Sequence, residues 1–121
     1  MANVLYADYQ NNTKYLSDKL RYNHIEVDCI GNQVRGNKIV LANDIFWDEY
    51  AKRLGEYGVL IAHLGVGFNA IAQQFINEFP KLSVVIVSSM PRDYSESRGR
   101  FLVCDYRDEQ LVPFVIAALA R

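Results

Sequence analysis

The chain has 121 residues, of which 50% are hydrophobic and 22% are charged, and its formal net charge is -1. A chain of this size buries a substantial core, so residues 1–121 are expected to form a single domain. Because binding to nucleic acid or to an anionic membrane requires a surplus of Lys and Arg, the near-neutral charge excludes both as general partners.

Apolar runs and amphipathic stripes alternate along the chain. The apolar runs show little polar alternation, which is typical of strands buried on both faces of a parallel sheet. The expected strands cover residues 3–7, 25–30, 58–64, 81–90 and 101–104. Helical apolar spacing and capping residues predict helices over about residues 13–22, 43–54, 68–79 and 108–121. No basic leader or long apolar run follows Met1, so a cytoplasmic location is expected.

One segment interrupts this alternation. Gly36-Asn37 lies between the short runs QVR and KIVL, a two-residue hairpin signal, so we expect a small β-hairpin insertion near residues 31–42. The rest of the pattern predicts an α/β fold of the flavodoxin-like type. Right-handed crossovers favour a five-stranded parallel sheet in the order 2-1-3-4-5, with helices on both faces.

The ends of the strands resemble those of response-regulator receiver domains. VLYADYQNN resembles the first strand and acidic pair of that family, and GVLIAH the third strand with its phosphoacceptor aspartate. VVIVSS resembles the fourth strand with its switch hydroxyl, and FLVCDYRDEQL the fifth strand with its lysine-proline pair. The resemblance implies that Asp8 is the second acid, Ser88 the switch hydroxyl and Phe101 the switch aromatic. The connection from Ser88 to Cys104 is short for this family, so the fourth helix is expected to be short or missing.

The departures from the family pattern lie in the phosphorylation pocket. Ala7 replaces the first acid, His63 stands at the phosphoacceptor position, Cys104 replaces the catalytic lysine and Asp105 the proline. Receiver phosphorylation needs Mg²⁺ on carboxylates, a carboxylate nucleophile and that lysine. The expected degenerate pocket consists of Asp8, His63, Ser88 and Cys104, without catalytic residues, metal or cofactor. Pseudo-receivers resemble this chain, which implies a phosphorylation-independent signalling module related to two-component systems and not an enzyme.

The last expected helix independently indicates a partner. LVPFVIAALA, residues 111–120, contains no charged residue, whereas a helix with one face in water should have a polar side. We expect a protein partner or a second copy, as in a homodimer, to cover it, although the 31–42 or 91–100 segment could instead fold over it. The expected interface residues are Leu111, Phe114, Val115, Ala118 and Leu119.

A glycine-containing turn supports an alternative function. Gly65, Gly67 and Asn69 belong to a G-x-G-x-x-A pattern between a strand and a helix, which could bind the phosphate of a nucleotide such as NADPH. Arg92, which follows Ser88-Ser89, would suit a 2′-phosphate. The ordinary interpretation is a tight turn that needs glycines.

Further chemical interpretations are weaker. A Ser-His-Asp relay of Ser88, His63 and Asp8 lacks a G-x-S-x-G elbow. A soft metal site that adds Cys104 would need ligands from four strands. Cys29 and Cys104 lie far apart without a C-x-x-C motif, so reduced, buried thiols are expected. Arginines at positions 92, 98, 100 and 107 could meet an acidic partner, but interleaved acids favour a solvated, self-neutralised face.

Overall fold

The computed structural model describes residues 2–8, 13–65, 68–88, 97 and 99–121. The strands are β1 (Val4–Asp8), β2 (Val27–Ile30), β3 (Gln33–Arg35), β4 (Lys38–Val40), β5 (Val59–His63), β6 (Ser83–Ser88) and β7 (Phe101–Asp105). The helices are α1 (Lys14–Tyr22), α2 (Ala42–Ile45), α3 (Phe68–Glu78) and α4 (Leu111–Leu119). A π-helical turn, η1 (Phe46–Tyr50), and a 3-10 segment, η2 (Ala51–Glu56), follow α2. No helix in these ranges is both long and apolar enough to cross a bilayer.

Five strands form one parallel sheet in the order β2-β1-β5-β6-β7. Because β3 and β4 pair as a separate hairpin, the strands of the sheet, counted along the chain, lie in the order 2-1-3-4-5. The expected α/β architecture with a five-stranded parallel sheet is confirmed. Strand bounds differ from expectation by only a few residues at the ends.

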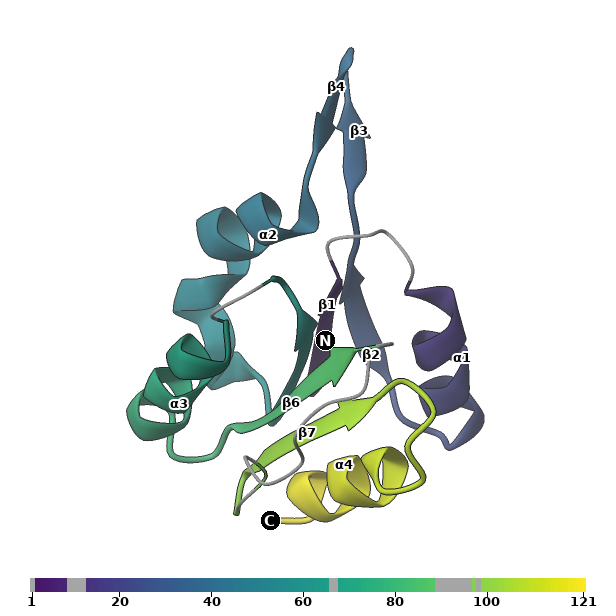
Figure 1. The fold of residues 1–121 in the computed structure, drawn as a ribbon, viewed down its shortest axis with the longest axis vertical. Helices are drawn as coiled ribbons and strands as arrows, with labels where there is room; N and C mark the ends of the chain where they lie inside the picture. Colours follow the sequence, from purple (N-terminus) through teal and green to yellow (C-terminus); the bar gives the residue numbers. More distant parts are fainter. Residues whose placement is uncertain (1, 9–12, 66–67, 89–96, 98) are drawn as a thin grey trace.

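Helices cover both faces of the sheet, as expected (Figure 1). In β5, Leu60 and Ala62 belong to the core layer beneath α2 and α3, whereas Val59 and Ile61 belong to the layer beneath α1 and α4. All four side chains are buried, which explains why this run shows no polar alternation. The same strand therefore contributes to two hydrophobic cores.

The predicted hairpin is confirmed at the expected place. β3 and β4 pair antiparallel, with Arg35 opposite Lys38, and Gly36 adopts φ +64° in the turn between them. A positive φ is unstrained for glycine, which is why Gly36-Asn37 predicts the turn. The hairpin projects from the end of β2 beyond the rest of the molecule (Figure 1).

The expected continuous helix over residues 43–54 is wrong in its geometry. The segment begins as α2, widens into the π-helical turn η1 and tightens into η2. The consecutive residues Phe46 and Trp47 both contact the rings of Phe68 and Phe75, with ring centroids 5.7–6.3 Å apart. Single π-helical turns occur as local widenings within α-helices, and this one begins at the residues that pack against α3.

Arg100 closes the C-terminal end of α3. Its guanidinium donates to backbone carbonyls that follow or end this helix, at 2.6–3.1 Å. The acceptors are the carbonyl oxygens of Ile76, Phe79, Pro80 and Leu82. A cation at a helix C-terminus satisfies carbonyls that have no intrahelical partner and complements the helix dipole. The interpretation of Arg100 as one of a solvated arginine group is therefore wrong.

Most of the β6–β7 connection falls outside the described residues. The predicted short or missing fourth helix concerns residues 89–98, of which only Ser97 is described. The Ser97 hydroxyl accepts a hydrogen bond from the Val103 amide at 2.9 Å. The state of the fourth helix therefore stays a prediction.

Candidate functional site

Polar side chains end the central strands at the carboxyl edge of the sheet. Asp8 at the end of β1 lies directly opposite His63 at the end of β5, and Ser88 of β6 lies opposite Asp105 of β7. Open α/β sheets place their ligand sites at this edge, because parallel strands all end there. The edge is therefore the candidate site.

A tyrosine hydroxyl joins Asp8 to His63. The Tyr106 hydroxyl donates to Asp8 Oδ2 at 2.6 Å, and the same oxygen lies 2.5 Å from His63 Nδ1. Because a phenol has only one proton and donates it to Asp8, its oxygen accepts from Nδ1–H of the imidazole. The lone pair of a neutral His63 is then on Nε2. Asp8, Tyr106 and His63 thus form a continuous hydrogen-bonded chain, called here the edge triad.

Asp8 is an almost fully buried carboxylate, with 1% of its surface exposed. A second hydroxyl, that of Tyr6, donates to the same Oδ2 at 3.1 Å. Burial, followed by the negative charge of Asp8, raises the pKa of Tyr6 far above its usual value, so Tyr6 remains a protonated donor. Phenolic donors thus stabilise the Asp8 carboxylate, as buried polar groups require.

The edge triad can hold an imidazole in a fixed orientation and tautomer. It can also relay a proton between Asp8 and His63 through the Tyr106 hydroxyl, because each member is within hydrogen-bond distance of the next. Among the described residues, no group of three or more His, Cys, Asp or Glu side chains could bind a metal ion.

Cys104, which was expected in this pocket, lies on the same face of the sheet as Asp8 and His63, but β6 separates it from His63 on β5. Its side chain is buried in the core layer beneath α4, together with Leu111 and Val115. Burial, with smaller contributions from Asp108 and Asp105, raises the pKa of the thiol to about 12.

Ser88 lies at the correct edge but on the other face of the sheet. Val85 and Val87 of β6 belong to the layer beneath α1 and α4, whereas Ile86 belongs to the layer beneath α3. Strand alternation therefore places Ser88 on the α3 side, and Asp8 and His63 on the α1 and α4 side. This placement opposes the Ser-His-Asp relay, which the sequence had already made a weak interpretation, and the hydroxyl that joins Asp8 to His63 is that of Tyr106.

The expectation of buried thiols is confirmed for Cys104 and wrong for Cys29, which is exposed, so the two cysteines should differ sharply in reactivity. Iodoacetamide at neutral pH should label the exposed Cys29 in the folded protein and reach the buried, protonated Cys104 only after unfolding. Mass spectrometry of peptides checks the site of labelling. Cys29→Ser should abolish labelling of the folded protein, and Cys104→Ala should leave it unchanged. Labelling of Cys104 before unfolding would contradict its placement in the core.

Phe101 lies at the start of β7, opposite Val84, and is buried in the core layer beneath α3. In this conformation it is a core residue, and its role as a switch aromatic stays a prediction.

The glycine turn is only partly described. Gly65 has φ +111°, and its carbonyl accepts from the Phe68 amide at 3.4 Å. Gly67 and the side chain of Asn69 lie outside the description, so phosphate binding also stays a prediction.

The predicted interface on the last helix is largely wrong. Leu111, Val115 and Ala118 are buried against the sheet within this chain, and Phe114 and Leu119 are half-buried. They form the inward side of α4, because they pack in the layer beneath it. The exposed side of α4 consists of Pro113, Ile116, Ala117 and Ala120. This outer α4 face is as uncharged as the inner one.

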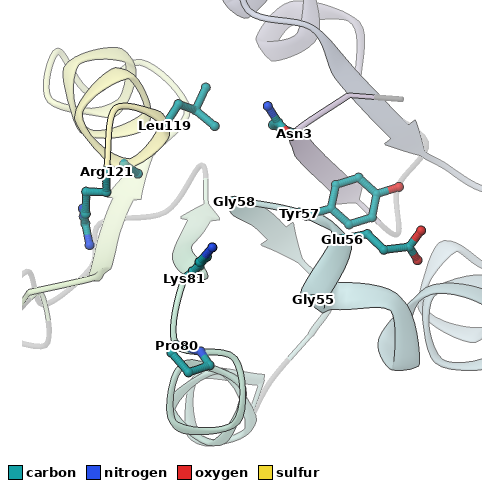
Figure 2. A pocket seen from close by; sticks show the side chains of 10 residues that line it. Asn3, Gly55, Glu56, Tyr57, Gly58, Pro80, Lys81, Leu119 and Arg121 are labelled. Carbon is teal, nitrogen blue, oxygen red and sulfur yellow. The ribbon is translucent and has the colours of Figure 1, made fainter.

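A cleft of about 360 Å³ lies at the opposite edge of the sheet, where β1 and β5 begin (Figure 2). Leu119 and Arg121 line one side of it, and Glu56 and Tyr57 the other, with Lys81 between them. The Glu56 carboxylate is paired with Arg53 at 2.9 Å. The remaining cations are exposed surface side chains, which do not define a ligand.

Sequence reasoning missed Tyr106 and Tyr6. Both are close to strand ends that the sequence predicts, yet neither occupies a position that the receiver pattern treats as functional. Tyr106 is 98 residues from Asp8 and 43 from His63 along the chain. The only available signal was a tyrosine directly after the last strand.

Comparisons with known proteins found no matching family model, no matching curated protein and no matching solved structure.

Proposed function

We propose that this chain is a receiver-like domain of flavodoxin-like topology that binds a protein partner, or a second copy of itself, without being phosphorylated. The strand order and the positions of Asp8 and His63 support the receiver-like part of the proposal. The observation that supports the absence of phosphorylation is the Tyr106 hydroxyl, which lies between these two side chains.

This hydroxyl opposes metal-assisted phosphorylation at the edge. Mg²⁺ binds oxygen ligands at about 2.0–2.1 Å and usually retains several waters. Asp8 Oδ2 already accepts hydrogen bonds from Tyr106 and Tyr6, and Asp8 is buried. A metal ion at Oδ2 would compete with these two hydroxyls, and an imidazole cannot form the acyl phosphate of a receiver. The edge triad instead holds the domain in one conformation.

The outer α4 face is the surface on which the proposal places the partner. Ile116 is 49% exposed at its centre, and its exposed neighbours Pro113, Ala117 and Ala120 are also uncharged. Such a face exposes apolar surface to water, which is unfavourable unless another protein covers it. A homodimer would bury the same face of both copies around a two-fold axis.

Thermal unfolding and sedimentation test this proposal. The midpoint of unfolding should rise with protein concentration, and Mg²⁺ with beryllofluoride should not move it, because His63 stands where a receiver has its phosphoacceptor carboxylate. Ile116→Asp should weaken self-association, and Tyr22→Asp, at an exposed aromatic residue on α1, should not. A monomer at all concentrations would leave a different protein as the partner and exclude the homodimer.

A stabilising response to Mg²⁺ with beryllofluoride would overturn the proposal. A rise of the midpoint with NADPH alone would instead favour the alternative function, nucleotide binding at the Gly65 turn. A ligand at about 100 times its dissociation constant adds roughly 2.7 kcal/mol to the free energy of unfolding, so either response would be measurable.

A further inference from the structure

The β3–β4 hairpin is an isolated two-stranded sheet. Within the described ranges, β3 and β4 pair only with each other, and both stand away from the main sheet (Figure 1). The outer edges of both strands therefore present backbone groups without a strand partner. Two-stranded hairpins are only marginally stable in water and are completed by further pairing or packing.

One face of this hairpin is turned towards the domain. The register places Gln33, Arg35, Lys38 and Val40 on a common face. The Arg35 guanidinium donates to both carboxylate oxygens of Glu49 in η1, at 3.3 and 3.4 Å, and also to Gln33 Oε1. Val40 packs against the core layer beneath α3. The polar face is thus the inward one.

The opposite face is apolar and points into solvent. Val34 and Ile39 are cross-strand partners, with exposed fractions of 76% and 71%. Leu41, which continues the strand in an extended conformation, lies on the same side by alternation and is 47% exposed. Hairpins that lie on a domain normally bury their apolar face, so this hairpin has the inverse orientation. The outer hairpin face is defined here by Val34, Ile39 and Leu41.

The charges on the hairpin favour one class of partner. Residues 31–42 include Arg35 and Lys38 and no acidic residue. Lys38 is exposed and forms no ion pair with the part of the chain that is described. Two copies of the hairpin would bring like charges together around a two-fold axis, which disfavours self-pairing. A partner segment in which carboxylates stand beside apolar residues would complement both Lys38 and the outer hairpin face.

We propose that the outer hairpin face and a free edge of the hairpin bind an extended segment of a partner protein, in which apolar residues alternate with Asp or Glu. The segment would add a third strand by backbone hydrogen bonds, and its apolar side chains would cover Val34, Ile39 and Leu41. This surface is separate from the outer α4 face, so the two proposals can fail independently.

Titration with synthetic peptides tests the proposal. A peptide of alternating valine and glutamate should bind the full chain and shift the backbone amide resonances of residues 33–41. A peptide of alternating valine and lysine should bind much more weakly, because Lys38 repels it. Ile39→Thr keeps a β-branched residue but removes an apolar contact, and should weaken binding about fivefold to tenfold.

Tyr22→Thr is the control, because it also replaces an exposed apolar side chain by threonine, on α1 and outside both proposed surfaces. It should leave peptide binding unchanged. Equal binding of the glutamate and lysine peptides, no binding of the glutamate peptide, or resonance shifts confined to α4 would each overturn the proposal. Self-association that Ile39→Thr abolishes would identify a second copy as the occupant and would also overturn it.

Discussion

Arg100→Met is expected to lower the free energy of unfolding by about 2–3 kcal/mol, because hydrogen bonds to a charged group are stronger than neutral ones. The substitution preserves a long apolar stem but removes a guanidinium that donates to carbonyls at the end of α3. Those carbonyls lose their partner and the helix dipole loses its cation. Urea unfolding, followed by far-ultraviolet circular dichroism, measures the loss.

Arg107→Met provides the matched control. Arg107 is exposed, and exposed substitutions of this kind usually change the free energy of unfolding by less than about 0.5 kcal/mol. Arg100→Lys should recover only part of the loss, because an ammonium group lacks the fork that reaches several carbonyls. If Arg100→Met were as stable as the Arg107→Met control, the capping role of Arg100 would be wrong.

Tyr106→Phe is expected to lower the free energy of unfolding by about 1–3 kcal/mol, the usual cost of a buried group that loses a hydrogen bond. The ring remains, but the hydroxyl that lies 2.6 Å from Asp8 Oδ2 and 2.5 Å from His63 Nδ1 is lost. Asp8 retains the Tyr6 hydroxyl, at the longer distance of 3.1 Å. Nitrogen chemical shifts of His63 should also change, since Tyr106 fixes the proton on Nδ1.

A double-mutant cycle with Asp8→Asn separates this interaction from general packing. Without the carboxylate, Tyr106→Phe should cost clearly less than in the wild-type chain, because the charge-assisted hydrogen bond no longer exists. Tyr6→Phe tests the longer contact in the same way and should show a smaller coupling. Equal costs of Tyr106→Phe in both backgrounds would show that Asp8 and Tyr106 are not energetically coupled.

Local sequence patterns predicted much of the fold. The buried run in β5 has no polar alternation because Leu60 and Ile61 face opposite cores, and the pattern records this directly. Gly36 marked the hairpin because its backbone needs a positive φ. The segment over residues 43–54 was predicted as one regular helix. Local patterns could not include the contacts of Phe46 and Trp47 with α3, which lies further along the chain.

The candidate site was only half predictable. Asp8 and His63 end neighbouring strands, so their opposition follows from the strand order. Tyr106 reaches them from the far end of the chain, and no local pattern encodes that contact.

Elements that depend on short-range physics could be predicted from the residues alone: buried β-branched strands, amphipathic helices and a glycine turn. The face that each element presents could not, because it depends on contacts between segments far apart in the chain, which form only in the folded molecule. Tertiary packing buried Leu111 and Val115 against the sheet. It turned Val34 and Ile39 towards solvent, since Arg35 and Glu49 hold the other face of the hairpin. Periodicity defines the faces of an element, but only packing chooses between them.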